Sequence, residues 1–579
     1  MNGQEAYDNS RAETLAQYFE KVQWAVRPVL DLQSNLSDLR SISVNYDQIS
    51  FKELRLAVAL MKRNKQCGAD SIPAEFLHSI CLPCSPASEW ILSLFQSIWS
   101  NKRVPDSWHL AKIAAIFKKG DVHECSNYRP ISLLSSSYKL FALILLNRLR
   151  KANVDEFIWP TQFGFRQGAR VSDALFMARR FIDKALATKD DKLVLLALDW
   201  AKAFDSIMPG PMLEALRRFG LPNQFLEMVS AIYDSRSFFV CDNHQDSSLH
   251  TQSAGISQGC PLSPFLFVIV MSVIIHDARA DLRACIGDAS NNVSEIMYAD
   301  DTLIVDQDGD IAQIYMDIIA RHGCHYGLQF KWDKLEYLCV RCTPALVKPD
   351  GSPIKHVTTM NYLGGLLSND AKVTSDLGRK IGEAMNTFSN LQRIWSHANL
   401  PIRKKLALFK SLVLSKLQYG IESMWLNQCE RRRLDAFHCK CVRRILKIQH
   451  SYFSRISNDQ VLAAAKEEPL SITALKQQLK LFGRLAISSS HPSRWLVFDS
   501  EDSFEKFDFN PRPVGRPRQC WVDEIYKLAI AISGSTDELA NIFHHRCAHS
   551  LDPWVTLIQA FRSPQHRLTS PILLCSPRI

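Results

Sequence analysis

Hydrophobic residues recur at helical spacing in the first and last parts of the chain. The pattern predicts amphipathic helices at residues 11–30 and 51–63, and another at 90–99 after a Pro- and Cys-containing stretch at 81–87. Beyond about residue 375 the apolar positions again fall almost only three and four residues apart. We therefore expect that last region to be helical throughout.

In the middle of the chain, shorter apolar runs alternate with turn residues. Residues 112–119 read as a strand with basic ends, and residues 192–199 form a nearly continuous apolar strand that ends in Asp199. A helix is expected at 212–219, with Gly220 as its stop. Strands and helices are thus mixed, and we predict an α+β fold for this part.

Two adjacent aspartates lie between β-prone runs at residues 296–297 and 303–305. The pattern predicts a hairpin whose tip, residues 298–301 (YADD), carries Asp300 and Asp301. Adjacent carboxylates repel each other unless a cation neutralises them, and hard oxygen ligands suit Mg²⁺. Phosphoryl chemistry is the first functional hypothesis, while a lone Asp-Asp pair is more often a turn or a cap.

Asp199 extends this hypothesis because it ends a buried strand. If that strand lies beside the hairpin, three carboxylates meet. Two-metal phosphoryl transfer needs such a set, since one ion lowers the pKa of a 3′-hydroxyl and the other holds a triphosphate. Phe204, which follows closely, is expected to exclude a 2′-hydroxyl sterically; its alternative role is core packing. The loop 255–264 (GISQGCPLSP) offers free amides to a base pair or a phosphate.

Composition narrows the function only modestly. The 579 residues suffice for roughly three or four domains, and a net charge of +10 favours polyanionic partners. The 16 cysteines are scattered and the start carries no apolar leader, so a reducing, intracellular compartment is expected, with nucleus and cytoplasm both open. The apolar run 265–275 is too short to span a bilayer and predicts a buried helix, so no membrane partner is expected.

Together these motifs resemble the reverse transcriptases of non-LTR (LINE-type) retrotransposons and, more distantly, the group II intron enzymes. The resemblance covers roughly residues 50–450 and follows the order of the motifs along the chain. Further segments that carry it are residues 65–75 (KQCGADSIPAE), 126–133 (SNYRPISL) and 162–166 (QFGFR).

The resemblance implies roles for the residues already singled out. Asp199, Asp300 and Asp301 would be the catalytic residues and would hold two Mg²⁺ ions, with Mn²⁺ as a substitute. Phe204 would discriminate between sugars. The full set implied to bind the nucleotide is Arg129, Lys118, Lys119, Phe204, Gln258, Gly259 and Lys334.

Arg129, with Lys118 or Lys119, resembles the residues of the family that hold the triphosphate. A guanidinium fork suits phosphate oxygens better than a point charge does, so Arg129 is the stronger candidate. The alternative for either lysine is an ordinary solvated side chain.

Lys334 falls where the family usually keeps a lysine that could protonate the leaving pyrophosphate. Its surroundings depart from the family pattern, because the usual asparagine is Lys331 and the usual threonine is Leu335. Residues 362–365 (YLGG) resemble the hairpin that supports the primer, and a Gly-Gly turn in an ordinary hairpin accounts for them equally well.

By resemblance the chain is a right-hand polymerase with fingers, a palm built on an antiparallel sheet, and a helical thumb whose basic residues contact backbone phosphates. The predicted divisions are a helical N-terminal extension at 1–50, fingers at 51–190, palm at 191–370, thumb at 371–450 and a helical C-terminal region at 451–579 with a linker near 499–519.

The function we expect is that of an RNA-directed DNA polymerase of retrotransposon origin. Its expected partners are an RNA template, a DNA primer and dNTPs, and its oligomeric state is open. Only about 50 residues precede the matched part, so no upstream endonuclease is expected. Two alternatives stay open: a catalytically inactive nucleic-acid-binding remnant of such an element, and a palm polymerase that makes RNA or works without a template.

Overall fold

The chain divides into two compact units, which are described separately. The computed structural model describes residues 10–30, 37–82, 85–500, 504–506, 519–544 and 552–561. The first unit comprises residues 1–169, 196–335 and 345–354; the second, called the helical unit below, comprises 170–195, 336–344 and 355–579. Most of the linker predicted near 499–519 lies outside the described residues.

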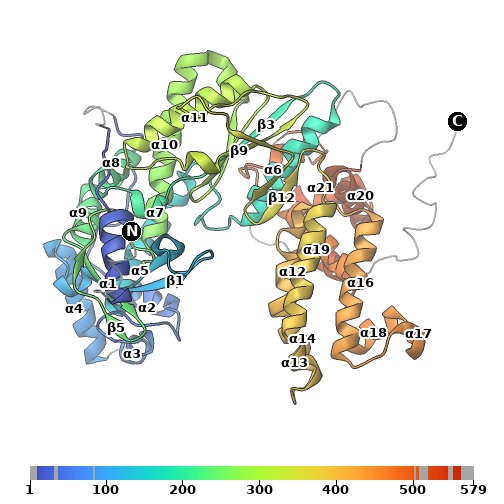
Figure 1. The fold of residues 1–579 in the computed structure, drawn as a ribbon, viewed down its shortest axis with the longest axis horizontal. Coiled ribbons are helices and arrows are strands. Elements are labelled where there is room, and N and C mark those ends of the chain that lie inside the picture. Colours follow the sequence, from blue (N-terminus) through green and yellow to red (C-terminus); the bar gives the residue numbers. More distant parts are fainter. Residues whose placement is uncertain are drawn as a thin grey trace. The chain divides into compact units, whose positions relative to one another are not determined.

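Helices supply most of the first unit (Figure 1). They are α1 (Arg11–Tyr18), α2 (Phe51–Leu60), α3 (Ala74–Ile80), α4 (Pro86–Asn101), α5 (Ser136–Lys151), α7 (Ala203–Ser206), α8 (Pro209–Phe219), α9 (Asn223–Tyr233), α10 (Ser263–Ile286) and α11 (Gly309–Cys324). Helix α8 ends at Gly220, whose φ of +105° is the left-handed conformation expected of a glycine stop. Helix α10 is buried over most of its length, which confirms the prediction for residues 265–275.

The first predicted helix is shorter than its pattern suggested. Helix α1 continues as a π-helical turn (Phe19–Gln23) and ends at Trp24, whereas the apolar spacing predicted a helix up to residue 30. Pro28 explains part of the difference, because a proline disfavours helical conformation in the residue before it. None of the described helices combines the length and the apolar character needed to cross a bilayer.

A buried ion pair joins α2 to α5. The guanidinium of Arg148 donates to Glu53 at 2.8 Å, and both side chains are almost fully enclosed. Glu53 also closes a capping box with Ser50 at the start of α2, so one carboxylate serves two neighbouring elements.

One sheet of the first unit is built around β1 (Leu110–Phe117), close to the strand predicted at 112–119. It pairs antiparallel with β2 (Tyr128–Leu133) and parallel with β4 (Ser237–Asp242). Two short strands, β5 (Gln245–Asp246) and β6 (His250–Thr251), pair antiparallel with β4.

The second group of strands carries the predicted carboxylates. Strands β7 (Ser294–Tyr298) and β8 (Asp301–Asp306) form an antiparallel hairpin, as predicted. Strand β3 (Leu193–Leu198), whose last three residues belong to the first unit, neighbours β8. Asp199 therefore follows a strand that lies next to the hairpin.

The helical unit holds two pairs of strands and a long series of helices (Figure 1). Strand β9 (Glu336–Val340) pairs parallel with β10 (Lys355–Val357), and β11 (Thr359–Tyr362) pairs antiparallel with β12 (Gly365–Ser368). The helices are α6 (Val171–Ala187), α12 (Thr374–Asn390), α13 (Gln392–Ser396), α14 (Ile402–Phe409), α15 (Ser415–Gln418), α16 (Gln428–Ile445), α17 (Ser451–Ser454), α18 (Asn458–Ala465), α19 (Leu470–Ile487), α20 (Trp521–Ser533), α21 (Thr536–His544) and α22 (Asp552–Ala560). The helical character predicted beyond residue 375 is confirmed.

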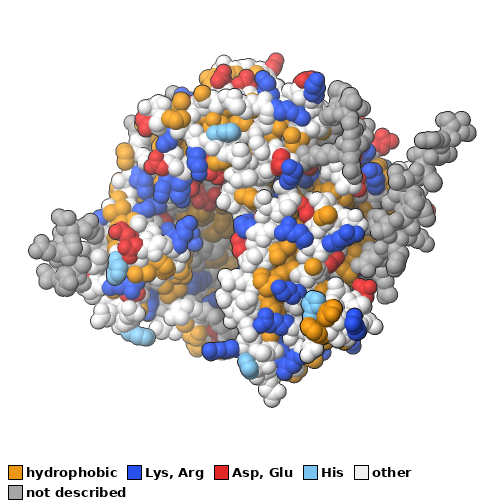
Figure 2. Space-filling view, turned by 45° about the vertical axis from the view of Figure 1, so that its right-hand side comes forward, with side chains coloured by type: hydrophobic (Ala, Val, Ile, Leu, Met, Phe, Trp, Pro, Cys, Tyr) orange, Lys and Arg blue, Asp and Glu red, His pale blue; other side chains and the backbone are white. Residues whose placement is uncertain are grey.

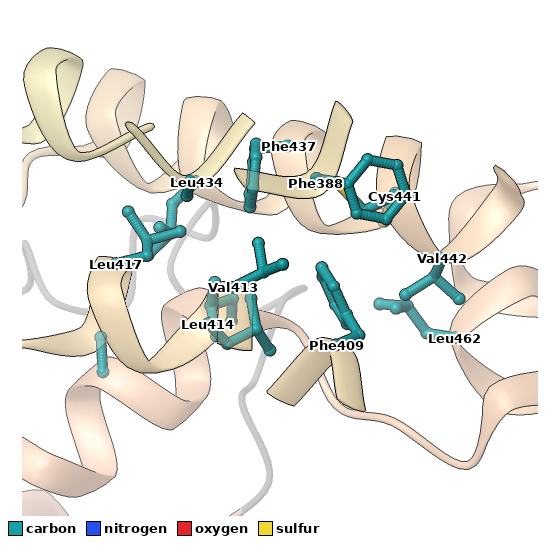
Figure 3. Packing of buried hydrophobic residues seen from close by; sticks show 14 of the residues in the cluster. Phe388, Phe409, Val413, Leu414, Leu417, Leu434, Phe437, Cys441, Val442 and Leu462 are labelled. Atoms are coloured by element: carbon teal, nitrogen blue, oxygen red, sulfur yellow. The ribbon is translucent and has the colours of Figure 1, made fainter. Parts of the chain in front are cut away.

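Apolar side chains from α12, α14, α16 and α18 form one core of the helical unit (Figure 3). Phe409 belongs to this cluster and is 1% exposed, and its ring meets that of Phe388 edge-on with centroids 5.7 Å apart. The positions that repeat at helical spacing in the sequence are thus the buried ones, which is the arrangement expected of packed amphipathic helices.

The core of the helical unit should be sensitive to cavities. We expect Phe409→Ala to lower the free energy of unfolding of this unit by about 3–5 kcal/mol, because it empties a packed site. Leu412 is 41% exposed on the following turn, and Leu412→Ala should change that free energy by less than about 0.5 kcal/mol. Urea unfolding followed by circular dichroism measures both, and equal losses would contradict the packing described.

Candidate active site

The tip of the β7–β8 hairpin holds the two adjacent aspartates. Tyr298 pairs with Asp301 in the register, so Ala299 and Asp300 make the turn. Ala299 has a φ of +58°, a left-handed conformation that residues with a Cβ seldom adopt. The turn therefore needs support from the rest of the unit.

Gln162 supplies that support from a fully buried position. Its side-chain oxygen accepts hydrogen bonds from the backbone N–H groups of Ala299 and Gly164, each at 2.8 Å, and its amide nitrogen donates to the carbonyl of Ala299 at 3.0 Å. A Cβ on Gly164 would lie 2.2 Å from the Ala299 nitrogen, so only glycine allows this close approach. Gln162 thereby fixes the backbone immediately before Asp300.

Asp199 is held from both its backbone and its side chain. Its carbonyl accepts the N–H of Lys331 at 2.7 Å, and its carboxylate forms an ion pair with the ammonium of Lys334 at 3.1 Å. Both side chains are partly exposed, so the pair contributes at most about 1 kcal/mol to stability. The ion pair matters for the position of the two groups, because it holds the ammonium of Lys334 next to the carboxylate of Asp199.

The aspartates interact with one another electrostatically. Burial raises the pKa of Asp300, and the negative charge of Asp199 raises it further, while Arg129 acts in the opposite direction. The pKa of Asp301 is raised to about 6, first by desolvation and then by the charges of Asp300 and Asp199, with Lys334 opposing them. Crowded like charges that resist ionisation are what a bound cation would relieve.

A group of cations faces these carboxylates. Arg129 lies on β2 opposite Ile116 in the register, and Lys118 follows the end of β1. Desolvation lowers the pKa of Lys118, and the positive charges of Arg129 and Lys334 lower it further. Arg129 and Lys334 therefore both lie within electrostatic range of Lys118.

Lys119 is exposed after the end of β1, as Lys118 is. Of the two, Lys118 lies within electrostatic range of Arg129 and Lys334. Lys118 therefore belongs to this group of cations, and Lys119 stays a candidate from the sequence alone.

The glycine-containing loop before α10 is fastened to β2. The carbonyl of Gln258 accepts the N–H of Ser132 at 2.9 Å. Gly259 has a φ of +147°, and a Cβ there would lie 2.2 Å from the Ser132 carbonyl oxygen. The loop consequently lies against the strand that carries Arg129.

Phe204 lies half-buried beside this loop. Its ring stacks on Phe267 with centroids 4.3 Å apart, and Phe165 meets it edge-on at 6.0 Å. Its carbonyl accepts the N–H of Ile256 at 2.7 Å, which ties it to the loop. These contacts suit a packing role, and they also hold the ring in one place, as a steric gate would require.

Two residues near the site were not singled out from the sequence. Gln162 belongs to a segment that carried the resemblance, yet no local pattern assigned it to the hairpin. Asp205 is nearly fully buried and accepts a hydrogen bond from the side-chain amide of Gln258 at 2.9 Å. The only signal for Asp205 is a charged residue within an otherwise apolar stretch that follows Phe204.

The carboxylates do not form a ready-made cage. Within the described part of the chain, no three His, Cys, Asp or Glu side chains come close enough together to hold a metal ion by themselves. Asp199, Asp300 and Asp301 therefore interact electrostatically, but they do not by themselves form a complete set of metal ligands. An ion here would need oxygen ligands from outside the protein as well.

An aspartate at a strand end beside a two-aspartate hairpin is the arrangement on which right-hand polymerases are built, and fold and site together place the first unit in this class. Residues 116–367 match the family described as "Reverse transcriptase (RNA-dependent DNA polymerase)". This part of the chain is a reverse transcriptase domain related to those of non-LTR retrotransposons, which confirms the resemblance seen in the sequence.

Several mobile-element proteins are similar to the chain. "Transposon TX1 uncharacterized 149 kDa protein" of Xenopus laevis is 30% identical over 45% of this chain and 20% of the relative. "RNA-directed DNA polymerase from mobile element jockey" of Drosophila melanogaster is 26% identical over 71% of this chain and 45% of the relative. A type-1 retrotransposable element R2 Pol polyprotein of Popillia japonica is 24% identical over 65% and 52%. The chain thus spans between a fifth and about half of these relatives.

Solved structures show weaker similarity. Apo telomerase from Candida Tropicalis, truncated from its C-terminal domain, gives a TM-score of 0.33 at 14% identity over 50% of this chain and 60% of the other. An insertion-loop deletion mutant of a human picorbirnavirus RNA-dependent RNA polymerase gives 0.41 at 13% identity over 81% and 80%. Neither score supports a detailed structural comparison.

Removing the side-chain amide of Gln162 should destabilise the hairpin turn. Gln162→Leu keeps the volume but leaves two buried N–H groups and a carbonyl without their partner, so we expect a loss of at least about 2 kcal/mol in the free energy of unfolding. Gln167→Leu, at an exposed position nearby, should leave that free energy nearly unchanged. Urea unfolding compares the two variants, and equal stability would show that Gln162 does not support the turn.

Proposed function

We propose that the protein is an RNA-directed DNA polymerase that adds dNMP to a primer 3′-hydroxyl on an RNA template. The observation that carries the proposal is the position of Asp199, at the end of the strand next to β8, beside the hairpin of Asp300 and Asp301, where their charges act on one another inside the region that matches the reverse transcriptase family. The match identifies the domain, and the coupled carboxylates supply the chemistry that such a domain needs.

Reverse transcriptases depend on divalent metal ions, and the residues present suit such ions. Carboxylate oxygens are the ligands that Mg²⁺ prefers, and a cation would offset the burial and the neighbouring negative charge that raise the pKa values of Asp300 and Asp301. Asp199, Asp300 and Asp301 would hold two Mg²⁺ ions, or Mn²⁺ in their place, together with phosphate oxygens of the substrate. The bound ions would activate the 3′-hydroxyl and neutralise charge on the transferred phosphate.

The chain's own residues would bind and orient the dNTP. Arg129 and Lys118 would hold triphosphate oxygens, and Lys119 stays a candidate for the same role from the sequence alone. Lys334, whose ammonium pairs with Asp199 at 3.1 Å, would donate a proton to the leaving pyrophosphate. The electrostatic range of Lys118 to Arg129 and Lys334 supports this grouping.

The loop and the aromatic ring would complete the nucleotide site. Gln258 and Gly259 would lie along the incoming nucleotide, and Phe204 would exclude a 2′-hydroxyl. The hydrogen bond between Ile256 and Phe204 supports a common site for the loop and the ring.

The nucleic acid partners of the proposal are an RNA template and a DNA primer. We retain the sequence-based division into fingers at 51–190, palm at 191–370 and thumb at 371–450 as part of the proposal. Exposed basic side chains on the thumb helices would contact backbone phosphates; they include Arg403, Lys404, Lys416, Arg433, Lys440 and Arg444. Figure 2 shows Lys and Arg side chains at many points of the visible surface.

The turn between β11 and β12 would support the primer. Its carbonyls at Leu363 and Gly364 accept hydrogen bonds from the Tyr419 hydroxyl at 2.9 Å and the Arg379 guanidinium at 2.8 Å. Both donors come from the helical region predicted as the thumb, so this hairpin is anchored within the helical unit rather than free to move.

The decisive test is primer extension with Asp300→Asn. The substitution removes a charge but keeps the shape, so incorporation of dNTPs on a primed RNA should fall at least about a thousandfold while binding of the primed template changes little. Asp288→Asn, at an exposed position in the same unit, is the matched control and should incorporate normally. Binding without extension by the unaltered protein would favour the inactive remnant, and undiminished incorporation by Asp300→Asn would overturn the assignment.

The sugar gate can be tested separately with Phe204→Ala. Removing the ring should raise the use of rNTPs relative to dNTPs by about tenfold or more, because the space for a 2′-hydroxyl opens. Phe204→Tyr keeps the ring and should retain the discrimination. The measurement is the ratio of kcat/KM for rNTPs to kcat/KM for dNTPs. An unchanged ratio with a lower melting temperature would assign Phe204 to packing. Ready use of rNTPs by the unaltered protein would indicate an RNA-synthesising polymerase.

A further inference from the structure

The N-terminal segment of the chain is folded into the first unit. Helix α1 packs along β4, and both Phe19 and Trp24 are almost fully buried. The indole of Trp24 meets Phe238 of β4 edge-on, with centroids 4.7 Å apart. Residues far from the catalytic motifs in sequence are thereby brought to the same unit as the site.

The end of this segment reaches Asp205. The side-chain amide of Gln23 donates to one oxygen of that carboxylate at 2.7 Å, and the indole N–H of Trp24 donates to the other at 3.0 Å. Asp205 is 4% exposed and directly follows Phe204. A carboxylate this deep in the protein requires such donors, and the N-terminal segment provides two of them.

The same carboxylate holds Gln258. The side-chain nitrogen of Gln258 donates to the Asp205 oxygen that also accepts from Gln23, at 2.9 Å. A carboxylate accepts but cannot donate, so this contact fixes which end of the Gln258 amide faces Asp205 and leaves its oxygen directed elsewhere. The orientation of the Gln258 amide therefore depends on where Asp205 is held.

Backbone contacts make the connection stiff. The N–H groups of Ile256 and Gly255 donate to the carbonyls of Phe204 and Ile207 at 2.7 Å each. A Cβ on Gly255 would come within 2.8 Å of the Asp205 backbone, so the two segments lie in direct contact. A shift of Asp205 would be passed to the loop that carries Gln258.

We propose that Gln23 and Trp24 are positioning residues for nucleotide binding, acting through Asp205 on the side chain of Gln258. The proposal rests on the nucleotide-binding role proposed above for Gln258. It makes the N-terminal segment a part of the polymerase site rather than an appended helix. It also gives the buried Asp205 a function, since that residue is the point where the two segments meet.

Trp24→Phe tests the proposal. The variant keeps an aromatic side chain near Phe238 but removes the N–H to Asp205 and part of the buried ring volume, and the control below shares that loss of volume. We expect the KM for dNTP on a primed RNA to rise about tenfold, the effect of losing one hydrogen bond to a charged group, with kcat within about twofold of the unaltered protein. Gln23→Met should act in the same direction.

Trp108→Phe is the matched control. Trp108 is also buried in the first unit, and its indole N–H donates to the Ser137 hydroxyl at 3.1 Å, so the variant loses a comparable hydrogen bond away from Asp205. The KM for dNTP should not change in this variant. A similar rise in KM for both tryptophan variants would overturn the proposal.

A second background separates positioning from general stability. Gln258→Met removes the amide, so in that background Trp24→Phe should change the KM by less than about twofold, because the two substitutions interrupt one path. An equal rise in both backgrounds would mean that Trp24 does not act through Gln258.

A measurement without catalysis distinguishes failure of this proposal from failure of the proposed function. If the unaltered protein does not incorporate dNTPs, the proposed function fails. The urea unfolding midpoints of the unaltered protein, Trp24→Phe, Gln258→Met and the double variant still test the connection from Trp24 through Asp205 to Gln258. Midpoint shifts of Trp24→Phe and Gln258→Met that are less than additive in the double variant support it. Fully additive shifts overturn it.

Discussion

The first unit is organised around the cost of placing adjacent carboxylates at a tight turn. Asp300 and Asp301 carry like charge, and the residue before them, Ala299, has a left-handed backbone conformation that costs free energy. Two hydrogen bonds join Ala299 to the buried side chain of Gln162, which also accepts one from Gly164, and they stabilise that conformation. The neighbouring strand then adds Asp199, so the site exists only because the surrounding structure holds unfavourable charges together.

Positively charged side chains lie near these carboxylates and offset part of the repulsion between them. Lys334 pairs with Asp199, while Arg129 favours ionisation of Asp300 and Lys118 lies within range of both cations. Carboxylates suit metal ions and cations suit phosphates, so the proposed binding of a metal-bound triphosphate rests on these two groups. Burial makes a carboxylate without hydrogen-bond donors costly, and buried Asp205 accepts hydrogen bonds from the neutral side chains of Gln23, Trp24 and Gln258.

Much of the local structure could be predicted because it depends on residues close in sequence. The β7–β8 hairpin, the strand ending at Asp199 and the buried helix α10 all follow from runs of apolar residues and their turn signals. The predicted end of the first helix is wrong, because apolar spacing continues past Trp24 although the helix ends there. Lys118 and Lys119 look alike in sequence, and only the tertiary structure shows that Lys118 interacts electrostatically with Arg129 and Lys334.

The order of residues along the chain places aspartates at strand ends and turns, and it carries enough motifs to indicate a reverse transcriptase domain. How those motifs are held depends on contacts between segments that are distant in the sequence. Gln162 supports a turn 137 residues away, and Gln23 reaches Asp205 across 182 residues. Such contacts depend on how distant segments pack, which no pattern of neighbouring residues specifies, and they decide the geometry on which the chemistry at the hairpin depends.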